Sequence, residues 1–380
     1  MGRAMATHIL AFNAGSATLK FAAFDVVSTV SVTDSVIEHP AVDAAAFDEV
    51  GRRLRAAGVT AITAVGHRVA HGGPRLSEAA LIDASVERAI ELATPLAPQH
   101  NPAALAGIRL ARQRWPGLPQ VAVFDTAFHA SMPERAATYA VPQAWRHAGV
   151  RRYGFHGLSH QHVFETVSAT LERDPADLRI VSCHLGNGGS VCAIERGRSI
   201  DTSMGMTALE GLVMGSRSGD LDPGIPGFVM RTFGMDHEQV EAALYHDSGL
   251  KALSAVSADL RQIEALACTG NPGALLALQV HAYRVRKYIG AYAAAMGGCD
   301  AVAFTGGAGE NSPALRWRIL QGLEFLGICL DERRNEAFGV SDEAAELQAP
   351  QSRVAVLAVR AREQRVIARE TVSVLRRTGL

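Results

Sequence analysis

Short apolar runs alternate with stretches of helical periodicity along the chain. The apolar runs predict strands within residues 9–25, 121–125, 179–196, 302–305 and 353–359. Apolar residues at helical spacing predict helices over residues 42–57, 85–91, 101–114, 275–296 and 363–377, the third of them starting at an Asn-Pro capping signal. This order of strands followed by helices indicates an α/β fold.

Two of the strand regions are predicted to be hairpins with turns of small residues. Residues 180–195 contain an apolar run, a Gly186–Ser190 turn and a second apolar run that ends in an acid. Residues 9–25 repeat this order, with hydroxyl-bearing residues in the turn. Such turns let backbone N–H groups approach an anion. Together with a glycine cluster at Phe304–Asn311, the two hairpins predict a duplicated fold that closes around a nucleotide.

The common nucleotide fingerprints do not occur in the sequence. It contains no Gly-x-x-x-x-Gly-Lys-Ser/Thr, which excludes a P-loop. No Gly-x-Gly-x-x-Gly follows a predicted strand, so a Rossmann dinucleotide site has no support.

Length and composition limit the class of protein. A chain of 380 residues predicts two or three domains at about 150 residues each. We expect an N-terminal domain over 1–150, completed by a C-terminal helix over 364–380, and a C-terminal domain over 151–363. A net charge of −1 gives no support for binding nucleic acid or an anionic membrane, and the five cysteines form no Cys-x-x-Cys pair. With an early strand and no apolar run of membrane-spanning length, the protein is expected to be soluble and cytoplasmic.

Histidine and arginine residues beside glycine are candidates for chemistry. Arg68 and Arg217 are each expected in a glycine-bordered loop, where the planar guanidinium suits a carboxylate or a phosphate. His156, His160 and His162 are spaced like metal ligands, but no acidic or cysteine residue completes a zinc set. A histidine beside glycine at a strand end is better explained as a hydrogen-bond donor to an anion.

The sequence resembles the acetate kinase (acetokinase) family, a member of the acetate and sugar kinase, Hsp70 and actin superfamily. The resemblance spans nearly the full length and rests on blocks in the family's order: Asn13-Ala-Gly-Ser-Ala-Thr-Leu-Lys20, His67-Arg-Val-Ala-His-Gly-Gly73, His100-Asn-Pro102, Asp125-Thr-Ala-Phe-His129, Arg152-Tyr-Gly-Phe-His-Gly157, His184-Leu-Gly-Asn-Gly188, Asp201-Thr-Ser-Met-Gly205, Gly215-Ser-Arg-Ser-Gly-Asp220 and Gly306-Gly-Ala-Gly-Glu-Asn311. It implies a two-domain duplicated actin-like fold (ASKHA, ribonuclease H-like) with a nucleotide cleft between the domains. It also implies reversible phosphoryl transfer from ATP to acetate, a homodimer, and magnesium as cofactor with manganese as an alternative.

The same resemblance implies roles for individual residues. Arg68 and Arg217 would hold the carboxylate and offset charge on the phosphoryl group. His156 would donate to that group, with His100 and His184 in support. Since a carboxylic acid titrates near pH ~4, the acceptor is already ionised at neutral pH, and Asp125 would align groups rather than accept a proton. ATP would be bound by Asn13, Ser16, Thr18, Lys20, Gly186, Asn187, Gly188, Asp259, Leu260, Arg261, Gly307, Gly309 and Asn311, magnesium by Asn13 and Glu363, and acetate in a pocket of Arg68, Ala70, Gln99 and Phe155.

Some positions depart from the family's pattern. Ala252 and Ala255 replace glycines, and Ala308 replaces a bulkier aliphatic residue, which leaves the adenine-side contacts open. Ala70 and Gln99 stand where acetate kinases typically carry valine and leucine. The smaller Ala70 predicts room for about one extra substrate carbon, so propionate is expected as a co-substrate.

Several alternatives stay open at this point. Within the family, they are a propionate kinase, a broader short-chain carboxylate kinase and a pyrophosphate-using acetate kinase. Outside it, a non-catalytic nucleotide switch of the Hsp70 or actin type shares the expected fold, but it would leave the blocks around Arg68, Asp125 and His156 unexplained. A sugar kinase would need a base for a neutral hydroxyl, and nothing in the sequence distinguishes that role.

Overall fold

The computed structural model describes residues 7–15, 18–28, 30–38 and 42–380, which form two compact units. Unit 1 comprises Met1–Ala130 and Arg362–Leu380, and unit 2 comprises Ser131–Ala361. The chain therefore passes between the units after Ala130 and again after Ala361. Residues 131–150, which the sequence prediction places in the N-terminal domain, group with unit 2, where the Tyr139 hydroxyl donates to Glu210.

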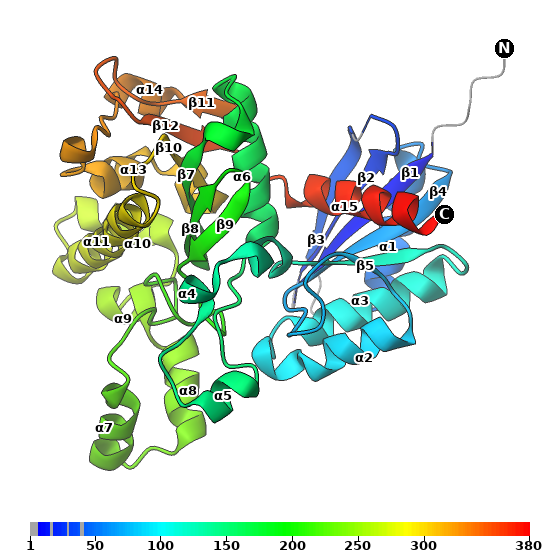
Figure 1. The fold of residues 1–380 in the computed structure, drawn as a ribbon, viewed down its shortest axis with the longest axis horizontal. Helices are drawn as coiled ribbons and strands as arrows, with labels where there is room; N and C mark the ends of the chain where they lie inside the picture. The colour runs from blue at the N-terminus through cyan, green and yellow to red at the C-terminus, as the bar shows by residue number, and fades with distance from the viewer. Residues whose placement is uncertain (1–6, 16–17, 29, 39–41) are drawn as a thin grey trace. The chain divides into compact units, whose positions relative to one another are not determined.

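A mixed sheet with the strand order β3-β2-β1-β4-β6-β5 forms the centre of unit 1 (Figure 1). Its central strands β1, β4 and β6 are parallel, and β2, β3 and β5 are each antiparallel to the neighbour that they pair with. The strands are β1 (His8–Ala14), β2 (Thr18–Asp25), β3 (Ser31–Glu38), β4 (Ile62–Val69), β5 (Ala80–Leu81) and β6 (Gln120–Phe124).

Helices cover both faces of this sheet. Leu10 and Phe12 of β1 pack with Phe47 of α1 in one apolar cluster, so the alternate residues of β1 face the other side. That side is covered by the C-terminal helix α15, whose Thr371 lies so close that a Cβ on Gly66 would meet its hydroxyl at 2.2 Å. The helices are α1 (Ala44–Ala56), α2 (Ala84–Leu92), α3 (Asn101–Arg114) and α15 (Glu363–Thr378), with 3-10 helices η1 (Thr94–Leu96) and η2 (Ala127–Ser131).

Unit 2 contains a second sheet with the order β11-β12-β10-β7-β8-β9. Here β7, β10 and β12 are parallel, while β8, β9 and β11 are antiparallel to their partners. The strands are β7 (Arg179–Leu185), β8 (Gly189–Glu195), β9 (Arg198–Thr202), β10 (Ala301–Thr305), β11 (Ala344–Glu346) and β12 (Ala355–Val359).

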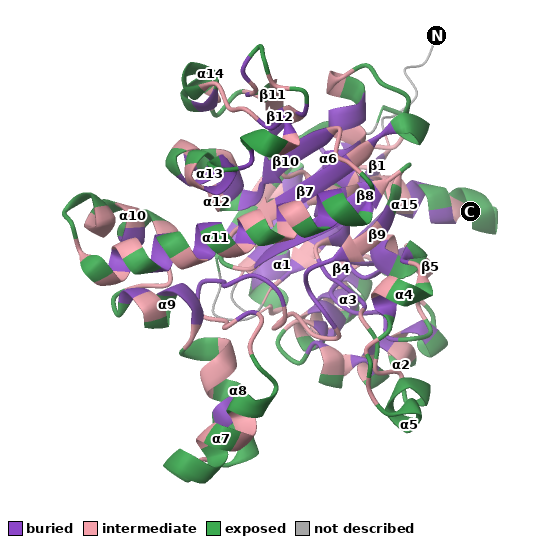
Figure 2. Cartoon of the chain, turned by 60° about the vertical axis from the view of Figure 1, so that its left-hand side comes forward, coloured by how far each residue is buried: buried purple, intermediate pink, exposed green. Residues whose placement is uncertain are grey.

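The helices of unit 2 enclose an apolar core on this sheet. Val181, Cys183 and Leu185 of β7 join a cluster with residues of α11 and α13, and the opposite face of β7 contacts α6. Buried positions concentrate on these strands, whereas α7 has no buried residue (Figure 2). The helices are α4 (Glu134–Ala137), α5 (Gln143–His147), α6 (Gly157–Thr170), α7 (Gly224–Phe233), α8 (His237–His246), α9 (Gly249–Ser254), α10 (Leu260–Cys268), α11 (Pro272–Ala295), α12 (Gly306–Asn311), α13 (Pro313–Leu320) and α14 (Glu332–Ala337), with 3-10 helices η3 (Pro175–Asp177) and η4 (Glu324–Leu326).

The two sheets have the same topology, which confirms the predicted duplication. Read from β9, the second sheet runs β9-β8-β7-β10-β12-β11, and each strand has the direction of its counterpart in β3-β2-β1-β4-β6-β5. Even the short edge strands match, since β5 precedes β6 in the chain as β11 precedes β12. The fold is therefore a duplicated α/β fold, as the hairpin pattern predicted.

The strands and helices predicted from periodicity are confirmed, with two local corrections. Helix α3 begins at Asn101, but its N-cap residue is His100, and the Asn101 side chain bonds to the backbone of His71 instead of capping. The glycine cluster at Phe304–Asn311, for which no helix is predicted, contains the short helix α12. None of the described helices is long and apolar enough to cross a membrane.

Candidate functional site

Polar residues of unit 1 gather where its parallel strands end. Asn13 lies on β1 and Arg68 on β4, each next to the last residue of its strand. Asp125 directly follows β6, and Glu363 is the first residue of α15. Because side chains alternate along a strand, and because Phe12 packs towards α1, Asn13 points to the face that α15 covers. The Asn13 amide donates to Glu363 Oε2 at 3.2 Å.

Arg68 and Asp125 form an ion pair on this face. Arg68 Nε donates to Asp125 Oδ2 at 3.0 Å, and Arg68 Nη2 donates to the same oxygen. The side chains are 15% and 3% exposed. Burial is the largest single influence on Arg68 and opposes its charged form, but the charge of Asp125, the hydrogen bonds to Asp125 and the charge of Glu363 together outweigh it, so the pKa of Arg68 is raised. The prediction that Arg68 lies in a loop is wrong: Arg68 lies on β4 and pairs with Val123 of β6, while the preceding His67 pairs with β1, which gives the guanidinium a rigid base.

Glu363 carries an unfavourable charge in this setting. Burial, and then the neighbouring carboxylate of Asp125, raise the pKa of Glu363 above its ordinary value of 4.5. The charges of Arg68 and Lys20 and the hydrogen bond from Asn13 act in the opposite direction without cancelling the shift. Two carboxylates with an amide beside them are a set of hard oxygen donors that is suited to a divalent cation.

The backbone after Arg68 is held by buried hydrogen bonds. Asn101 Nδ2 donates to the His71 carbonyl at 3.0 Å, and Asn101 Oδ1 accepts the His71 N–H at 3.1 Å. Ala70, next to this pair, is 1% exposed. Of the other predicted site residues of unit 1, His100 and Thr18 are half-buried, Gln99 and Lys20 are exposed, and Ser16 lies outside the described residues.

The corresponding hairpin of unit 2 carries His184. It is the next-to-last residue of β7 and pairs with Ser190 of β8, as Asn13 of β1 pairs with Lys20 of β2. The duplicated fold therefore places a polar residue at the same hairpin position in each unit.

A network from α6 orients the histidines at this hairpin. His156 Nδ1 and His160 Nε2 are hydrogen-bonded to Ser190 Oγ at 2.9 and 2.8 Å, and Ser159 Oγ to His184 Nδ1 at 2.7 Å. The rings of His156 and His184 stack with their centroids 4.3 Å apart. His156 precedes α6 with a φ of 58°, a left-handed conformation that costs a non-glycine residue about 1–3 kcal/mol and is concentrated at functional sites.

Arg217 and the β7–β8 turn lie close together in unit 2. A Cβ on Gly188 would be 3.6 Å from both Arg217 Nη1 and His156 Nε2. Arg217 lies outside the helices and strands, donates to the Ala208 carbonyl at 3.0 Å, and has a pKa that burial lowers. Gly215 lets the Asn187 side chain approach, since a Cβ there would be 2.1 Å from Asn187 Oδ1.

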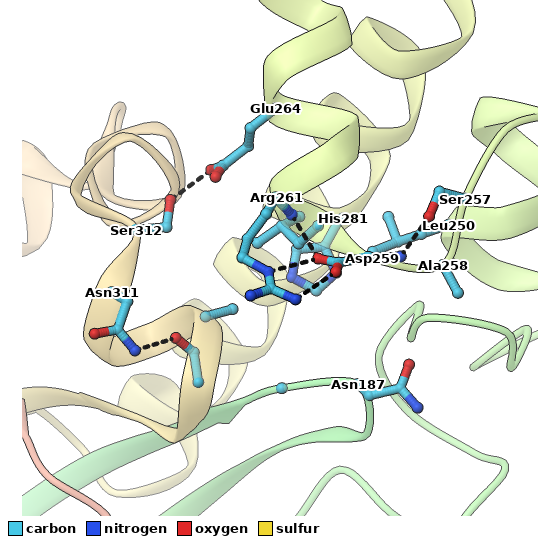
Figure 3. A pocket seen from close by; sticks show the side chains of 14 residues that line it. Asn187, Leu250, Ser257, Ala258, Asp259, Arg261, Glu264, His281, Asn311 and Ser312 are labelled. Carbon is cyan, nitrogen blue, oxygen red and sulfur yellow. Dashed lines mark hydrogen bonds and ion pairs between the residues drawn. The ribbon is translucent and has the colours of Figure 1, made fainter.

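A cavity of about 730 Å³ in unit 2 begins at this turn (Figure 3). Asn187 lies at one end, while Glu264 and Ser312 lie at the other, where the Ser312 hydroxyl donates to the Glu264 carboxylate at 2.5 Å. The predicted residues Gly186, Asn187, Asp259, Leu260, Arg261, Gly307 and Asn311 line the cavity, whereas Gly188 and Gly309 are not among its lining residues.

The cavity also contains residues that the sequence analysis missed. Leu250, Glu264, His281 and Ser312 belong to it, and burial lowers the pKa of His281 below its ordinary value. Glu264 and His281 lie within α10 and α11, where no local spacing distinguishes them in the sequence. Phe155, predicted for the acetate pocket, lies in unit 2 in the apolar core cluster, and Arg68, Ala70 and Gln99 lie in unit 1.

A duplicated sheet with a polar hairpin in each half is the architecture of the acetate and sugar kinase, Hsp70 and actin superfamily. The acetokinase family model matches residues 44–369. An acetate kinase from Thermotoga maritima is 48% identical over 320 residues, which are 84% of this chain and 79% of that relative. The crystal structure of Porphyromonas gingivalis acetate kinase superposes with a TM-score of 0.89 at 37% identity, covering 97% of this chain and 100% of the other. The crystal structure of a propionate kinase from Francisella tularensis superposes with a TM-score of 0.88 at 35% identity, covering 96% of this chain and 98% of the other.

The chain belongs to the acetokinase family. It is thus a phosphotransferase with a carboxyl group as acceptor and ATP as co-substrate.

Proposed function

We propose that this chain catalyses the reversible transfer of the γ-phosphoryl group of ATP to acetate, which gives acetyl phosphate and ADP. The observation that carries the proposal is the buried Arg68–Asp125 pair beside Glu363 at the ends of parallel strands. A guanidinium fixed in this way suits a carboxylate, which a nucleotide switch has no need to bind. Relatives named acetate kinase support acetate as the acceptor.

The acceptor carboxylate attacks the γ-phosphorus without needing a general base, because a carboxylic acid is ionised at neutral pH. Asp125 therefore serves as an aligner: its Oδ2 accepts from both Nε and Nη2 of Arg68 and fixes the direction of the guanidinium. The chemical difficulty is to bring one anion against a polyanion. Fixed positive charge and hydrogen-bond donors reduce this repulsion, and they cost no reorganisation during the reaction.

Arg68 and Arg217 supply that charge, and His156 supplies a donor. The Nδ1 atom of His156 is engaged by Ser190, and that of His184 by Ser159, which fixes both rings. In this role His156 donates to the phosphoryl group, with His184 and His100 in support. Arginine residues used in this way contribute about 10³–10⁵ in rate.

The nucleotide occupies the unit 2 cavity. Asn187 and the Gly186–Gly188 turn bind the phosphates at one end. The adenosine lies between Asp259–Arg261 and the α12 segment with Gly307, Gly309 and Asn311. In unit 1, the residues that we propose for ATP are Asn13, Thr18 and Lys20 of the β1–β2 hairpin.

Magnesium is the cofactor that the unit 1 residues fit. No group of three or more His, Cys, Asp or Glu side chains in the described ranges could hold a metal alone. Magnesium commonly binds through one or two carboxylates together with substrate phosphates, and Glu363 with Asn13 offers such a partial set. When bound, the ion neutralises charge on the β- and γ-phosphates.

Propionate is the second acceptor that we propose. Ala70 lies in the backbone segment fixed by Asn101, and its methyl group is smaller than the valine typical of acetate kinases. The space corresponds to about one substrate carbon, and a methylene is worth roughly 10- to 200-fold in specificity.

We also propose a homodimer that uses the exposed face of α7. Ile225, Phe228, Met230 and Phe233 are 41%, 57%, 36% and 69% exposed, an apolar patch typical of a protein interface. Phe228→Asp should convert the dimer to a monomer in sedimentation velocity, whereas Phe325→Asp, at an exposed phenylalanine outside α7, should not.

Trapping of the acyl phosphate as hydroxamate tests the reaction. Wild-type protein with ATP, magnesium and C1 to C4 carboxylates should give hydroxamate with acetate and propionate. Arg68→Ala should abolish it, while the exposed control Arg109→Ala should retain it. Wild-type protein that gives no hydroxamate with any of these acids would refute the proposal.

A further inference from the structure

The α12 segment lines the nucleotide cavity, yet it is too short to be stable by itself. It spans Gly306–Asn311 and contains three glycines, the residue that loses most conformational freedom on folding. Its inner hydrogen bond, from Asn311 Nδ2 to the Gly307 carbonyl at 2.9 Å, is visible in Figure 3. The position of Gly307, Ala308 and Asn311 in the cavity therefore depends on groups outside α12.

Arg316 donates hydrogen bonds to the backbone of α12. It is 1% exposed and donates through Nη1 to the carbonyls of Gly309 and Glu310 at 2.8 and 2.9 Å. Its Nε and Nη2 donate to the side chain and the carbonyl of Asn335, both at 2.7 Å. All four acceptors are neutral oxygens, and burial together with the charge of Arg360 lowers the pKa of Arg316 to about 10. A leucine at this place would avoid the cost of a buried charge but would leave these four acceptors without their donor, so the position of α12 depends on the arginine.

Arg360 holds the other side of α12. Its Nη1 donates to Glu310 Oε2 at 3.0 Å and to Asn311 Oδ1 at 3.1 Å. The guanidinium is itself fixed over the ring of Phe338, 4.6 Å from the centroid, and it donates to the carbonyls of Asp342 and Gly339. The side chains of Asn311, in the cavity, and Glu310 are thus set by one buried cation.

Glu310 connects α12 to the last residue of unit 2 through hydrogen bonds to Arg360 and Ala361. Its second oxygen, Oε1, accepts the N–H of Ala361 at 2.9 Å. Ala361 is the last residue of unit 2, and Glu363 begins α15 two positions later. One carboxylate therefore links the nucleotide-lining segment with the backbone that leads to the proposed metal ligand.

We propose that Arg316, Arg360 and Glu310 are positioning residues for the nucleotide and the metal. The two arginines fix α12 against the cavity. Glu310, in addition, sets the backbone at Ala361 and with it the approach to Glu363. This inference rests on the proposed function for the place of the nucleotide in the cavity and for the role of Glu363.

The three residues should differ in what they affect. Arg316→Lys keeps the charge but cannot reach four acceptors, so it should weaken binding of the fluorescent analogue mant-ADP without metal by about tenfold or more, the effect expected from losing a charged hydrogen bond. Its Mn²⁺ affinity at saturating ADP, measured by electron paramagnetic resonance, should stay within about twofold of wild type. Glu310→Gln cannot accept from both Arg360 and Ala361, so it should weaken both mant-ADP and Mn²⁺ binding. Arg318→Lys on the same helix is the control and should change neither.

Two results would overturn the proposal. The first is mant-ADP affinity within about twofold of wild type in Arg316→Lys and Glu310→Gln, both folded by circular dichroism. The second is the same Mn²⁺ affinity in Glu310→Gln as in Arg316→Lys. If Arg316→Lys does not fold, Arg360→Lys tests the same segment from its other side. These binding measurements use no acyl acceptor, so a failure of the proposed reaction would appear separately, as wild-type protein that forms no acyl hydroxamate.

Discussion

Replacement of Asp125 by alanine removes the carboxylate from a buried ion pair and leaves the charge of Arg68. The side chains are 15% and 3% exposed, and breaking such a pair typically costs about 3–5 kcal/mol. Glu363 reduces this cost, because its raised pKa is due in part to Asp125 and should fall when that charge is removed. Its ionised carboxylate then offsets the charge of Arg68. We therefore expect the lower end, a loss of about 3 kcal/mol in the free energy of unfolding.

Urea unfolding followed by tryptophan fluorescence measures this loss. Trp115 packs against the core of unit 1, while Trp145 and Trp317 are 57% and 40% exposed, so the change in signal mainly reports unit 1. The matched control is Glu91→Ala, which breaks an ion pair with Arg109 whose side chains are 39% and 52% exposed.

The exposed pair should contribute under about 1 kcal/mol. If Asp125→Ala and Glu91→Ala lower the free energy of unfolding equally, the Arg68–Asp125 pair contributes no more to stability than an exposed ion pair, and the reasoning fails.

Three further variants address the chemistry. Arg217→Ala should lower kcat by about 10³-fold or more in a coupled ADP assay. Arg217→Lys should recover little activity, because burial already opposes a positive charge at this site and lysine loses its proton more readily than arginine. Full activity of Arg217→Lys would show that only a diffuse positive field is needed. Because the pKa of Glu363 is raised in the folded state, its protonated form stabilises the fold at pH values below the ordinary carboxyl pKa of 4.5. This stabilisation is lost as the pH rises through the folded-state pKa and Glu363 ionises. Metal-free Glu363→Gln should therefore resist urea better than wild type at neutral pH while losing its response to magnesium; lower stability at every pH would contradict this. Ala70→Val should reduce kcat/KM for propionate by about tenfold and spare acetate, and an equal effect on both acids would show that Ala70 does not line the pocket.

The elements that the sequence predicted are those with a local signal. The hairpins at 9–25 and 179–196 combine apolar strands with turns of small residues, and the duplication follows from their similarity. Strand β4 was missed because Gly66, His67 and Arg68 interrupt its apolar pattern. Those residues are explained only by distant partners: Gly66 accommodates Thr371 of α15, and Arg68 pairs with Asp125. No window of neighbouring residues contains that information.

The candidate site divides in the same way. Residues inside glycine-rich blocks, such as Asn187 and Arg217, were predicted, because the block itself is distinctive. Glu264 and His281 were missed because they occupy helices in which a single polar residue has no special spacing. Their place in the cavity arises when α10 and α11 pack together.

Phosphorus NMR of the wild-type protein with ATP, magnesium and acetate tests the central claim most directly. We predict that acetyl phosphate and ADP appear in equal amounts, that neither appears without acetate, and that Arg68→Ala forms no acetyl phosphate. Formation of ADP and inorganic phosphate at a rate independent of acetate would instead identify a hydrolysing nucleotide switch, and would contradict the assignment of a carboxylate kinase.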